Sequence, residues 1–222
     1  VKEKPVNTLG LKNVKILWFL IGTAMIFAIM PLNSILAEWN AGLKLPESLS
    51  ALEQMMKQMQ ESASAMIEKF VSVDTIGGLM LNLFMIAGLA ALGEELIFRS
   101  IIQTSLIKIC KNAHVGILIA SAIFSFIHLE FYGFVPRLIL GMLLGYMFYF
   151  SGSIWIPMLM HFLNNGTVVL VYFLNNKAIT NIDVDTFGQT SIPILILSIV
   201  VMIVLFIFSI KYSDKERTIT GS

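Results

Sequence analysis

Long apolar stretches dominate the pattern of residues along the chain. Six of them are long enough, or nearly so, to enter a bilayer, which a helix crosses with about 20 residues. Because backbone polar groups in hydrocarbon must be paired within the segment, and no strand-like alternation is present, we expect helices. The stretches run over about 14–37, 76–109, 115–129, 134–150, 154–174 and 192–210.

The connection between the first two stretches has an amphipathic pattern instead. Over about 47–70, apolar residues recur at helical spacing opposite charged and amide side chains,. Ser50 followed by Glu53 predicts a capping box at the start of this helix. We expect the helix to pack on the bundle or to lie among lipid headgroups on the external side, with a lid or substrate-docking role as the alternative.

Composition places the chain in a membrane. Hydrophobic residues make up 57% of the 222 residues and charged residues only 13%, about half the charged fraction of a soluble domain. We therefore predict an all-α, polytopic transmembrane helical bundle, with residues 1–222 forming a single membrane-embedded domain and a motif-bearing core at about 76–175. The net charge of +1 implies no nucleic-acid partner, and the single Cys110 excludes an internal disulfide and a cysteine metal cluster,.

Basic residues predict the orientation in the membrane. They gather before the first stretch, after the second and after the last, so all three groups fall on one side if every stretch crosses, and both termini are expected to be cytoplasmic. Because the chain starts at Val1 without a Met, we expect the sequence to begin partway into a longer gene product. The basic residues are Lys2, Lys4, Lys12, Lys15, Lys108, Lys111, Lys211, Lys215 and Arg217.

Three ionisable residues interrupt the second apolar stretch. A charge at this depth costs a few kcal/mol, so it points to a function by default. Glu95 and Arg99 are four residues apart, where side chains on a helix meet, and we expect them to neutralise each other. Glu94 projects about 100° away on a helix of 3.6 residues per turn. A structural ion pair therefore accounts for Glu95 and Arg99 but leaves Glu94 without a partner in that turn.

Two histidines and an amide lie in later stretches. His128 is near the end of the third stretch, and His161 and Asn165 share one face of the fifth. Taken singly, each histidine is more typical of a hydrogen-bonded core residue, and the asparagine of a helix–helix contact. The spacing of the set is what favours a shared site.

Depth along the helices brings these residues together. Glu94 precedes Lys108 by fourteen residues, and His128 follows His114 by fourteen. On two helices joined by the short turn between Lys108 and His114, each would lie about 21 Å from that turn at 1.5 Å per residue. His161, nine residues after a second turn on the same side, reaches a comparable depth. We therefore predict that the carboxylate, the imidazoles and the amide of Asn165 converge in the cytoplasmic half.

Such a cluster has the chemistry of a hydrolase. A carboxylate beside a histidine in a dry pocket can activate water as a general base, and a second histidine with an amide can donate hydrogen bonds to an oxyanion. The target would be an acyl bond, most simply a peptide. The sequence has no His-Glu-x-x-His and no Gly-x-Ser-x-Gly motif, which argues against a zincin-type protease and a serine nucleophile elbow.

The order of three short motifs resembles a known family. They are Glu94-Glu95-x-x-x-Arg99, Phe124-x-x-x-His128 and His161-x-x-x-Asn165. Together they resemble the CAAX protease and bacteriocin-processing (CPBP, or Abi) family of intramembrane proteases, over residues of about 80–174. The resemblance implies a helical membrane endopeptidase similar to the Ras-converting CAAX endopeptidase.

The resemblance also implies a role for each matched residue. By motif position, Glu94 would activate water with His128, His161 and Asn165 would hold the oxyanion, and Glu95, Arg99 and Phe124 would support the site. The implied substrate is a membrane-associated peptide or protein, and the style of the match implies a bacterial plasma membrane and maturation of bacteriocin or pheromone leaders, or self-immunity.

Two questions stay open at this point. The family is often labelled as metalloproteases, and Glu94, His128 and His161 would be the ligands if zinc is bound. A glutamate-dependent reaction without metal fits equally and is the one we favour, so no cofactor is assigned. The alternatives to a peptidase are a non-catalytic membrane scaffold or regulator with the same fold, and a proton-coupled transporter, for which no inverted repeat is evident.

Overall fold

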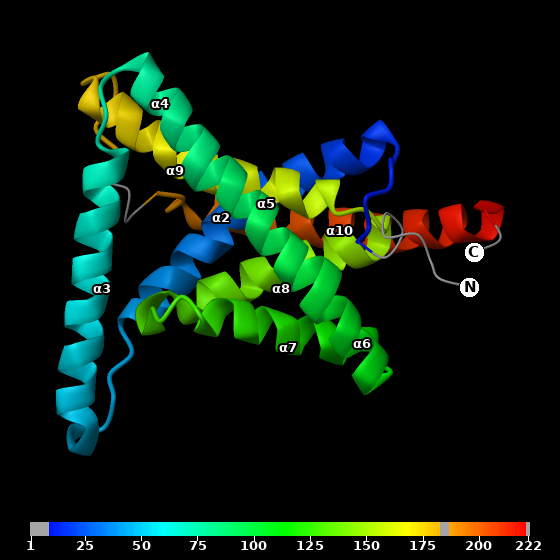
Figure 1. Ribbon diagram of the computed structural model, residues 1–222, viewed down its shortest axis with the longest axis horizontal. Helices are drawn as coiled ribbons and strands as arrows, with labels where there is room; N and C mark the ends of the chain where they lie inside the picture. Colours follow the sequence, from blue (N-terminus) through cyan, green and yellow to red (C-terminus); the bar gives the residue numbers. More distant parts are fainter. Residues whose placement is uncertain (1–8, 183–186, 221–222) are drawn as a thin grey trace.

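The computed structural model (Figure 1) describes residues 9–182 and 187–220, and these form helices without strands. Five helices in this part of the chain are long and apolar enough to cross a membrane. The prediction of a polytopic helical bundle is therefore confirmed. The five run over Ile16–Ala41, Ile76–Cys110, Phe131–Ser151, Trp155–Asn176 and Ile192–Asp214.

The remaining apolar stretch forms a shorter helix. Helix α7 spans Ala113–Phe126 and has 14 residues, or about 21 Å of length, which is less than the thickness of a bilayer core. Asn112 caps its start by accepting a hydrogen bond from the Val115 amide at 3.1 Å. The chain leaves α7 through a non-helical loop and returns in the opposite direction along α8 (Phe134–Ser151).

The long helix that carries the Glu-Glu pair is not a regular α-helix. It comprises α4 (Ile76–Asn82), the π-helical η2 (Leu83–Leu89), α5 (Ala90–Glu95), the π-helical η3 (Leu96–Gln103) and α6 (Thr104–Cys110). The sequence analysis did not predict the π turns. In η3 three successive residues, from Phe98 to Ser100, are all buried. π turns occur often at functional sites, and here they lie on both sides of α5, the segment that contains Glu94 and Glu95.

The apolar core lies where α2 (Ile16–Ala41) crosses α8 and α9 (Trp155–Asn176). Gly22 permits a close approach there, because a Cβ at this position would lie 3.1 Å from the side chain of Met160. Helix α10 (Ile192–Thr220) packs along α2 on the outside of this core. The fully buried side chains at the centre are Trp18, Met25, Ile26, Leu144, Met147, Ile156 and Met160.

The two ends of the molecule differ in the elements they hold. The start of α2, the α6–α7 turn, the α8–α9 turn and the end of α10 gather at one end, and α3 and the α7–α8 loop lie towards the other (Figure 1). This grouping agrees with the predicted grouping of the basic segments, although Lys2 and Lys4 and the side chains of Lys215 and Arg217 lie outside the described residues. Which side of the membrane each end faces stays a prediction.

The amphipathic connection forms a short 3-10 turn, Glu47–Leu49, followed by α3 (Ser50–Val71). The predicted capping box is wrong, because the 3-10 turn starts the helical segment earlier and Leu49, not Ser50, is the N-cap residue of α3. The Glu53 carboxylate instead accepts a hydrogen bond from the Leu45 amide at 3.1 Å.

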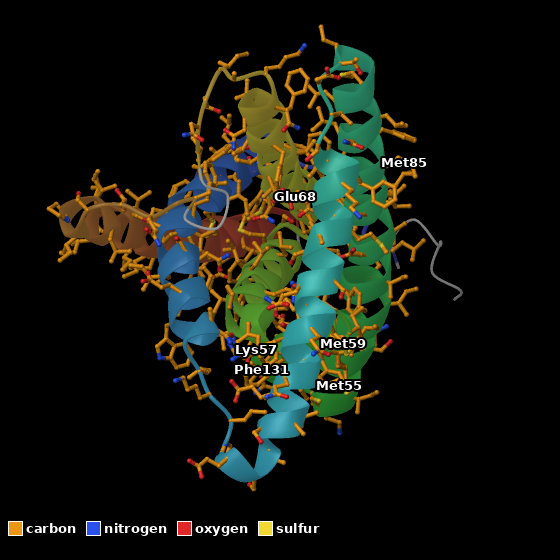
Figure 2. The ribbon with its side chains drawn as sticks, turned by 90° about the vertical axis from the view of Figure 1, so that its left-hand side faces the viewer. Met55, Lys57, Met59, Glu68, Met85 and Phe131 are labelled. Carbon is orange, nitrogen blue, oxygen red and sulfur yellow. The ribbon has the colours of Figure 1, made fainter. Side chains whose placement is uncertain are left out.

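Helix α3 runs along one side of the molecule (Figure 2). In this view Met55 and Met59 project from one side of the helix and Lys57 from the other. Met55 is 58% exposed and Met66 is 63% exposed, so much of the apolar face does not pack on the bundle. An apolar face that stays open in this way suits the second expectation for this helix, a position among lipid headgroups.

Candidate active site

Glu95 joins the long helix to α9 through a fully buried ion pair. One carboxylate oxygen accepts a hydrogen bond from Arg99 Nε at 2.8 Å, and the other accepts one from His161 Nδ1 at 2.8 Å. The side chains of Glu95 and Arg99 have no exposed surface, and that of His161 is 5% exposed. The contact from Glu95 to Arg99 was expected from their spacing. The contact from Glu95 to His161 was not, because it depends on the crossing of two helices.

The Arg99 side chain also contacts an aromatic ring. Its guanidinium carbon lies 5.1 Å from the centre of the Phe124 ring, within the range of a cation–π contact. Phe124 also packs edge-on against His128, with ring centres 5.0 Å apart, and against His161, with ring centres 6.0 Å apart. Phe124 therefore packs against both histidines and the arginine, which fits the supporting position that the sequence analysis gave it.

Glu94 points away from this ion pair towards both histidines. Its Oε2 atom lies 3.9 Å from His128 Nε2 and 3.8 Å from His161 Nε2. The same oxygen is buried and has no hydrogen-bond partner among the described residues, although the side chain as a whole is 31% exposed. The structure thus places one carboxylate oxygen, unpaired among the described residues, against two imidazole nitrogens, one from α9 and one from the loop after α7.

His128 lies in the loop that follows α7. Its Nδ1 is 2.7 Å from the carbonyl oxygen of Phe124, which fixes the orientation of the ring. The next residue, Leu129, adopts the left-handed conformation with φ of 55°, which is uncommon for a residue with a branched side chain. This local geometry allows the chain to turn back towards α8 directly after the histidine.

Asn40, at the end of α2, holds the same loop from outside. Its Nδ2 donates a hydrogen bond to the Phe131 carbonyl at 3.0 Å, and its Oδ1 accepts one from the Val135 amide at 2.7 Å. Asn40 is 1% exposed. Sequence reasoning missed this residue, because an asparagine near the end of an apolar stretch is also typical of a helix end, and its partners are more than 90 positions away in the chain.

The hydrogen-bond partners decide which imidazole nitrogens carry protons. A carbonyl and a carboxylate only accept hydrogen bonds, so Nδ1 of His128 and Nδ1 of His161 are both donors. The Nε2 atoms of neutral rings are then acceptors that face Glu94. Separations of 3.8 and 3.9 Å are too long for direct hydrogen bonds,. They suit a water molecule that bridges the carboxylate and an imidazole.

Asn165 lies one turn after His161 on α9. Its Nδ2 donates to the carbonyl of Ile86 at 3.3 Å, and its Oδ1 accepts from Asn164 Nδ2 at 3.1 Å. Within the described residues, no hydrogen bond joins Asn165 to Glu94 or to either histidine. The amide therefore connects α9 to the π-helical η2, and one of its two N–H groups has no partner among the described residues.

The ligand types of the site suit zinc, but their spacing does not. Bonds of about 2.0–2.1 Å in a tetrahedral set would place two ligand atoms about 3.3 Å apart, whereas Glu94 Oε2 is 3.8 and 3.9 Å from the two nitrogens. No group of three or more His, Cys, Asp or Glu side chains in the described part of the chain is arranged to hold a metal ion. We therefore derive no step through a metal.

These observations define the class of protein. The chain is a polytopic integral membrane protein in which a carboxylate and two imidazoles meet between helices. The model of the type II CAAX prenyl endopeptidase Rce1-like family matches residues 76–167, which contain all three sequence motifs. This part of the chain matches the model of that family, so the resemblance inferred from the motifs is confirmed. No curated protein and no solved structure matches the chain.

The match to this family has general consequences for function. The family implies a CAAX-type intramembrane peptidase, acting on membrane-associated substrates within the bilayer. It does not favour a scaffold or a transporter. The catalytic type, the substrate and the roles of individual residues need a separate argument.

Proposed function

We propose that the chain is an intramembrane endopeptidase that hydrolyses a peptide bond of a membrane-associated peptide or protein with water activated by Glu94 and His128. The observation that carries this proposal is the buried Glu94 Oε2, which has no hydrogen-bond partner among the described residues and faces Nε2 of both histidines at 3.8 and 3.9 Å. A purely structural carboxylate at membrane depth would be expected to pair directly, as Glu95 does.

The proposed reaction begins with a water between Glu94 and His128. The water donates one hydrogen bond to the carboxylate and the other to Nε2 of His128. As its oxygen attacks the peptide carbonyl carbon, Glu94 takes a proton. The resulting carboxylic acid then gives that proton to the leaving nitrogen as the C–N bond breaks, and the water oxygen remains in the new carboxyl group.

His161 is proposed to stabilise the oxyanion in its protonated form. Donation from Nε2 requires a proton there, because Nδ1 already donates to Glu95. The charges support this state. With Arg99 positive and both glutamates negative, one imidazolium brings the cluster to zero net charge, and His161 lies between the two carboxylates. The free N–H of Asn165 is the second proposed donor, as the motif position implies.

We also propose a biological setting, which the motifs and the basic residues of the sequence support. We place the protein in a bacterial plasma membrane with cytoplasmic termini. Bacteriocin or pheromone leader peptides are the proposed substrates, with self-immunity as the related role. We also propose a glutamate-dependent reaction, which elemental analysis of active protein together with chelator treatment would test. Stoichiometric zinc that is lost along with activity would overturn that assignment.

The test of the proposed function is the Glu94→Gln variant. A comparison of the proteomes of cells with wild-type and variant protein identifies uncut precursors, and the purified proteins are then assayed on that precursor. We expect cleavage to fall by about 10³-fold or more, because a general base contributes about 10²–10⁴. Glu61→Gln, on the exposed side of α3, is the control and should cleave normally. Full activity in Glu94→Gln would remove Glu94 as the base.

A further inference from the structure

A second polar site lies between α2 and α9. A cavity of about 220 Å³ opens between these helices, next to the side chains of Asn33 and Ser34 on α2 and of Asn164 and Thr167 on α9. Its apolar walls include Met30. None of the described residues that line this cavity is charged, and their chemistry suits a neutral ligand that both donates and accepts hydrogen bonds.

Two polar atoms at this cavity lack protein partners. Asn33 Oδ1 and Ser34 Oγ are buried and make no hydrogen bond to any described residue, and Ser34 is only 8% exposed. Leaving such atoms unpaired away from water is unfavourable. Ordered water is the usual partner of buried polar groups, and a polar cavity of this size has room for several molecules. The observations therefore point to water as the ligand.

The cavity is connected to the catalytic motif through Asn164. Asn164 lines the cavity and donates from Nδ2 to Asn165 Oδ1 at 3.1 Å. Because Asn165 Oδ1 is occupied by this donor, the amide of Asn165 is oriented with its nitrogen towards the Ile86 carbonyl. A flipped amide would place two acceptors against each other at Ile86 and two donors at Asn164.

We propose that the cavity binds ordered water and that Asn164, kept hydrated there, is a positioning residue that fixes the amide of Asn165 with its nitrogen available to the oxyanion. The second part rests on the proposed function, and the first does not. The proposal accounts for two successive asparagines in the middle of a membrane-crossing helix, where an amide without a partner is costly.

Hydration of the cavity can be tested without an activity assay. The full chain is placed in nanodiscs and irradiated with X-rays, which split bound water into hydroxyl radicals at the place where it is bound. These radicals oxidise neighbouring methionines, and mass spectrometry measures the extent of oxidation of each one. We expect Met30 to be oxidised at least about fivefold faster than Met25, which lies on the same helix and is fully buried in the apolar core of the molecule. Met66, which is 63% exposed, reports the radical dose.

Variants that fill the cavity or make its lining less polar complete this test. Ser34→Val removes the hydroxyl group and adds volume, and Thr167→Val is a milder variant of nearly the same shape should the first fail to fold. Either should lower the oxidation of Met30 towards the rate of Met25 and leave Met66 unchanged. Equal rates for Met30 and Met25 in the wild-type protein, or a Met30 rate that is unaffected in a folded filling variant, would overturn the water site.

Positioning is tested by kinetics on the precursor identified with Glu94→Gln. We expect Asn164→Leu to lower kcat about tenfold with little change in KM, and Asn164→Gln to keep part of the activity that Asn164→Leu loses. In a protein that already carries Asn165→Ala, Asn164→Leu should have no further effect on kcat. A wild-type kcat in folded Asn164→Leu, or effects that simply add in the double variant, would exclude the positioning role. If wild-type protein cleaves nothing, the proposed function and the positioning role fail together, and the oxidation of Met30 still decides the water site.

Discussion

The two histidines of the site are held in opposite ways. His161 lies within a regular helix, is 5% exposed and donates to the buried Glu95 carboxylate. His128 lies in a loop after the end of α7, is 28% exposed and donates to a backbone carbonyl of its own segment. One histidine is thus fixed by a buried ion pair between two helices, and the other by the path of a loop.

This difference suggests that the two histidines have different functions. A buried group that is held by an ion pair keeps its geometry without reorganisation, which is what stabilisation of a developing charge requires. A group on a loop beside exposed surface can admit substrate and water, and it depends on the residues that hold the loop. We therefore expect changes on the His161 side to affect folding first and changes on the His128 side to affect turnover first.

The largest expected effect is the loss of stability in Arg99→Met. This substitution leaves the Glu95 carboxylate buried without the guanidinium that pairs with it, and breaking a buried ion pair typically costs about 3–5 kcal/mol. The free energy of unfolding, measured by denaturant titration in detergent, should fall by that amount. Adding Glu95→Gln to Arg99→Met should recover part of it, since the unpaired charge is then absent.

Arg137→Met is the matched control on the His128 side. Arg137, in the first turn of α8, pairs with Glu130 in the loop before it, and their side chains are 19% and 25% exposed. A partly exposed ion pair contributes less than a fully buried one, so we expect Arg137→Met to cost less than Arg99→Met. If Arg99→Met and Arg137→Met destabilise the protein equally, the buried ion pair is not what distinguishes the two sides.

The second effect is a loss of turnover in Asn40→Ala. Without Asn40, the carbonyl of Phe131 and the amide of Val135 lose their partners, and the loop that carries His128 loosens. A shift of about 1 Å at a catalytic group can cost about 10²-fold in rate, so we expect kcat to fall about 10- to 100-fold with a smaller change in KM. Asn40→Asp, which keeps the acceptor for Val135, should retain more activity than Asn40→Ala. An unchanged kcat in a folded Asn40→Ala protein would show that the loop holds His128 by itself.

These residues show how much of the structure was predictable. Hydropathy predicted the helical bundle and its segments, because the requirement to pair every backbone polar group in hydrocarbon leaves few alternatives. The spacing of Glu95 and Arg99 predicted their contact, because i and i+4 side chains meet on one helix. Counting residues from the turn also predicted that Glu94 and His128 lie at the same depth, and the structure places them 3.9 Å apart.

Features that depend on contacts between distant segments could not be predicted in this way. The contact from Glu95 to His161 requires the crossing of two helices, and the role of Asn40 requires a loop 91 positions away. The capping box was wrong for a local reason, because a 3-10 turn precedes α3 and the Glu53 carboxylate accepts a hydrogen bond from the Leu45 amide. The π turns beside α5 have no sequence signal that the hydrophobic pattern reveals.

The smallest expected effect concerns this Glu53 contact, which attaches α3 to the loop that follows His128. The carboxylate is 2.8 Å from Lys57 Nζ and accepts a hydrogen bond from the Tyr132 hydroxyl at 3.3 Å. The hydrogen bond from Lys57, followed by the one from the Leu45 amide, holds the pKa of Glu53 below its ordinary value of 4.5. A lowered pKa in the folded state means that the contact stabilises the attachment above pH 4.5 and loses this effect as the pH falls through the folded-state pKa.

Hydrogen exchange at the Leu45 amide measures the hydrogen bond from this amide to Glu53 directly. We expect its protection factor, corrected for the intrinsic exchange rate, to decrease as the pH falls below the ordinary pKa of Glu53, while the protection of core amides in α2 stays constant. Glu53→Gln should have lower protection at neutral pH and little dependence on pH, and Glu61→Gln on the same helix should behave like wild type. Because α3 has few other contacts with the bundle, local opening of this segment leaves the Glu95 ion pair intact. A drop in core protection together with that of Leu45 would show instead that α3 and the two sides of the site unfold as one unit.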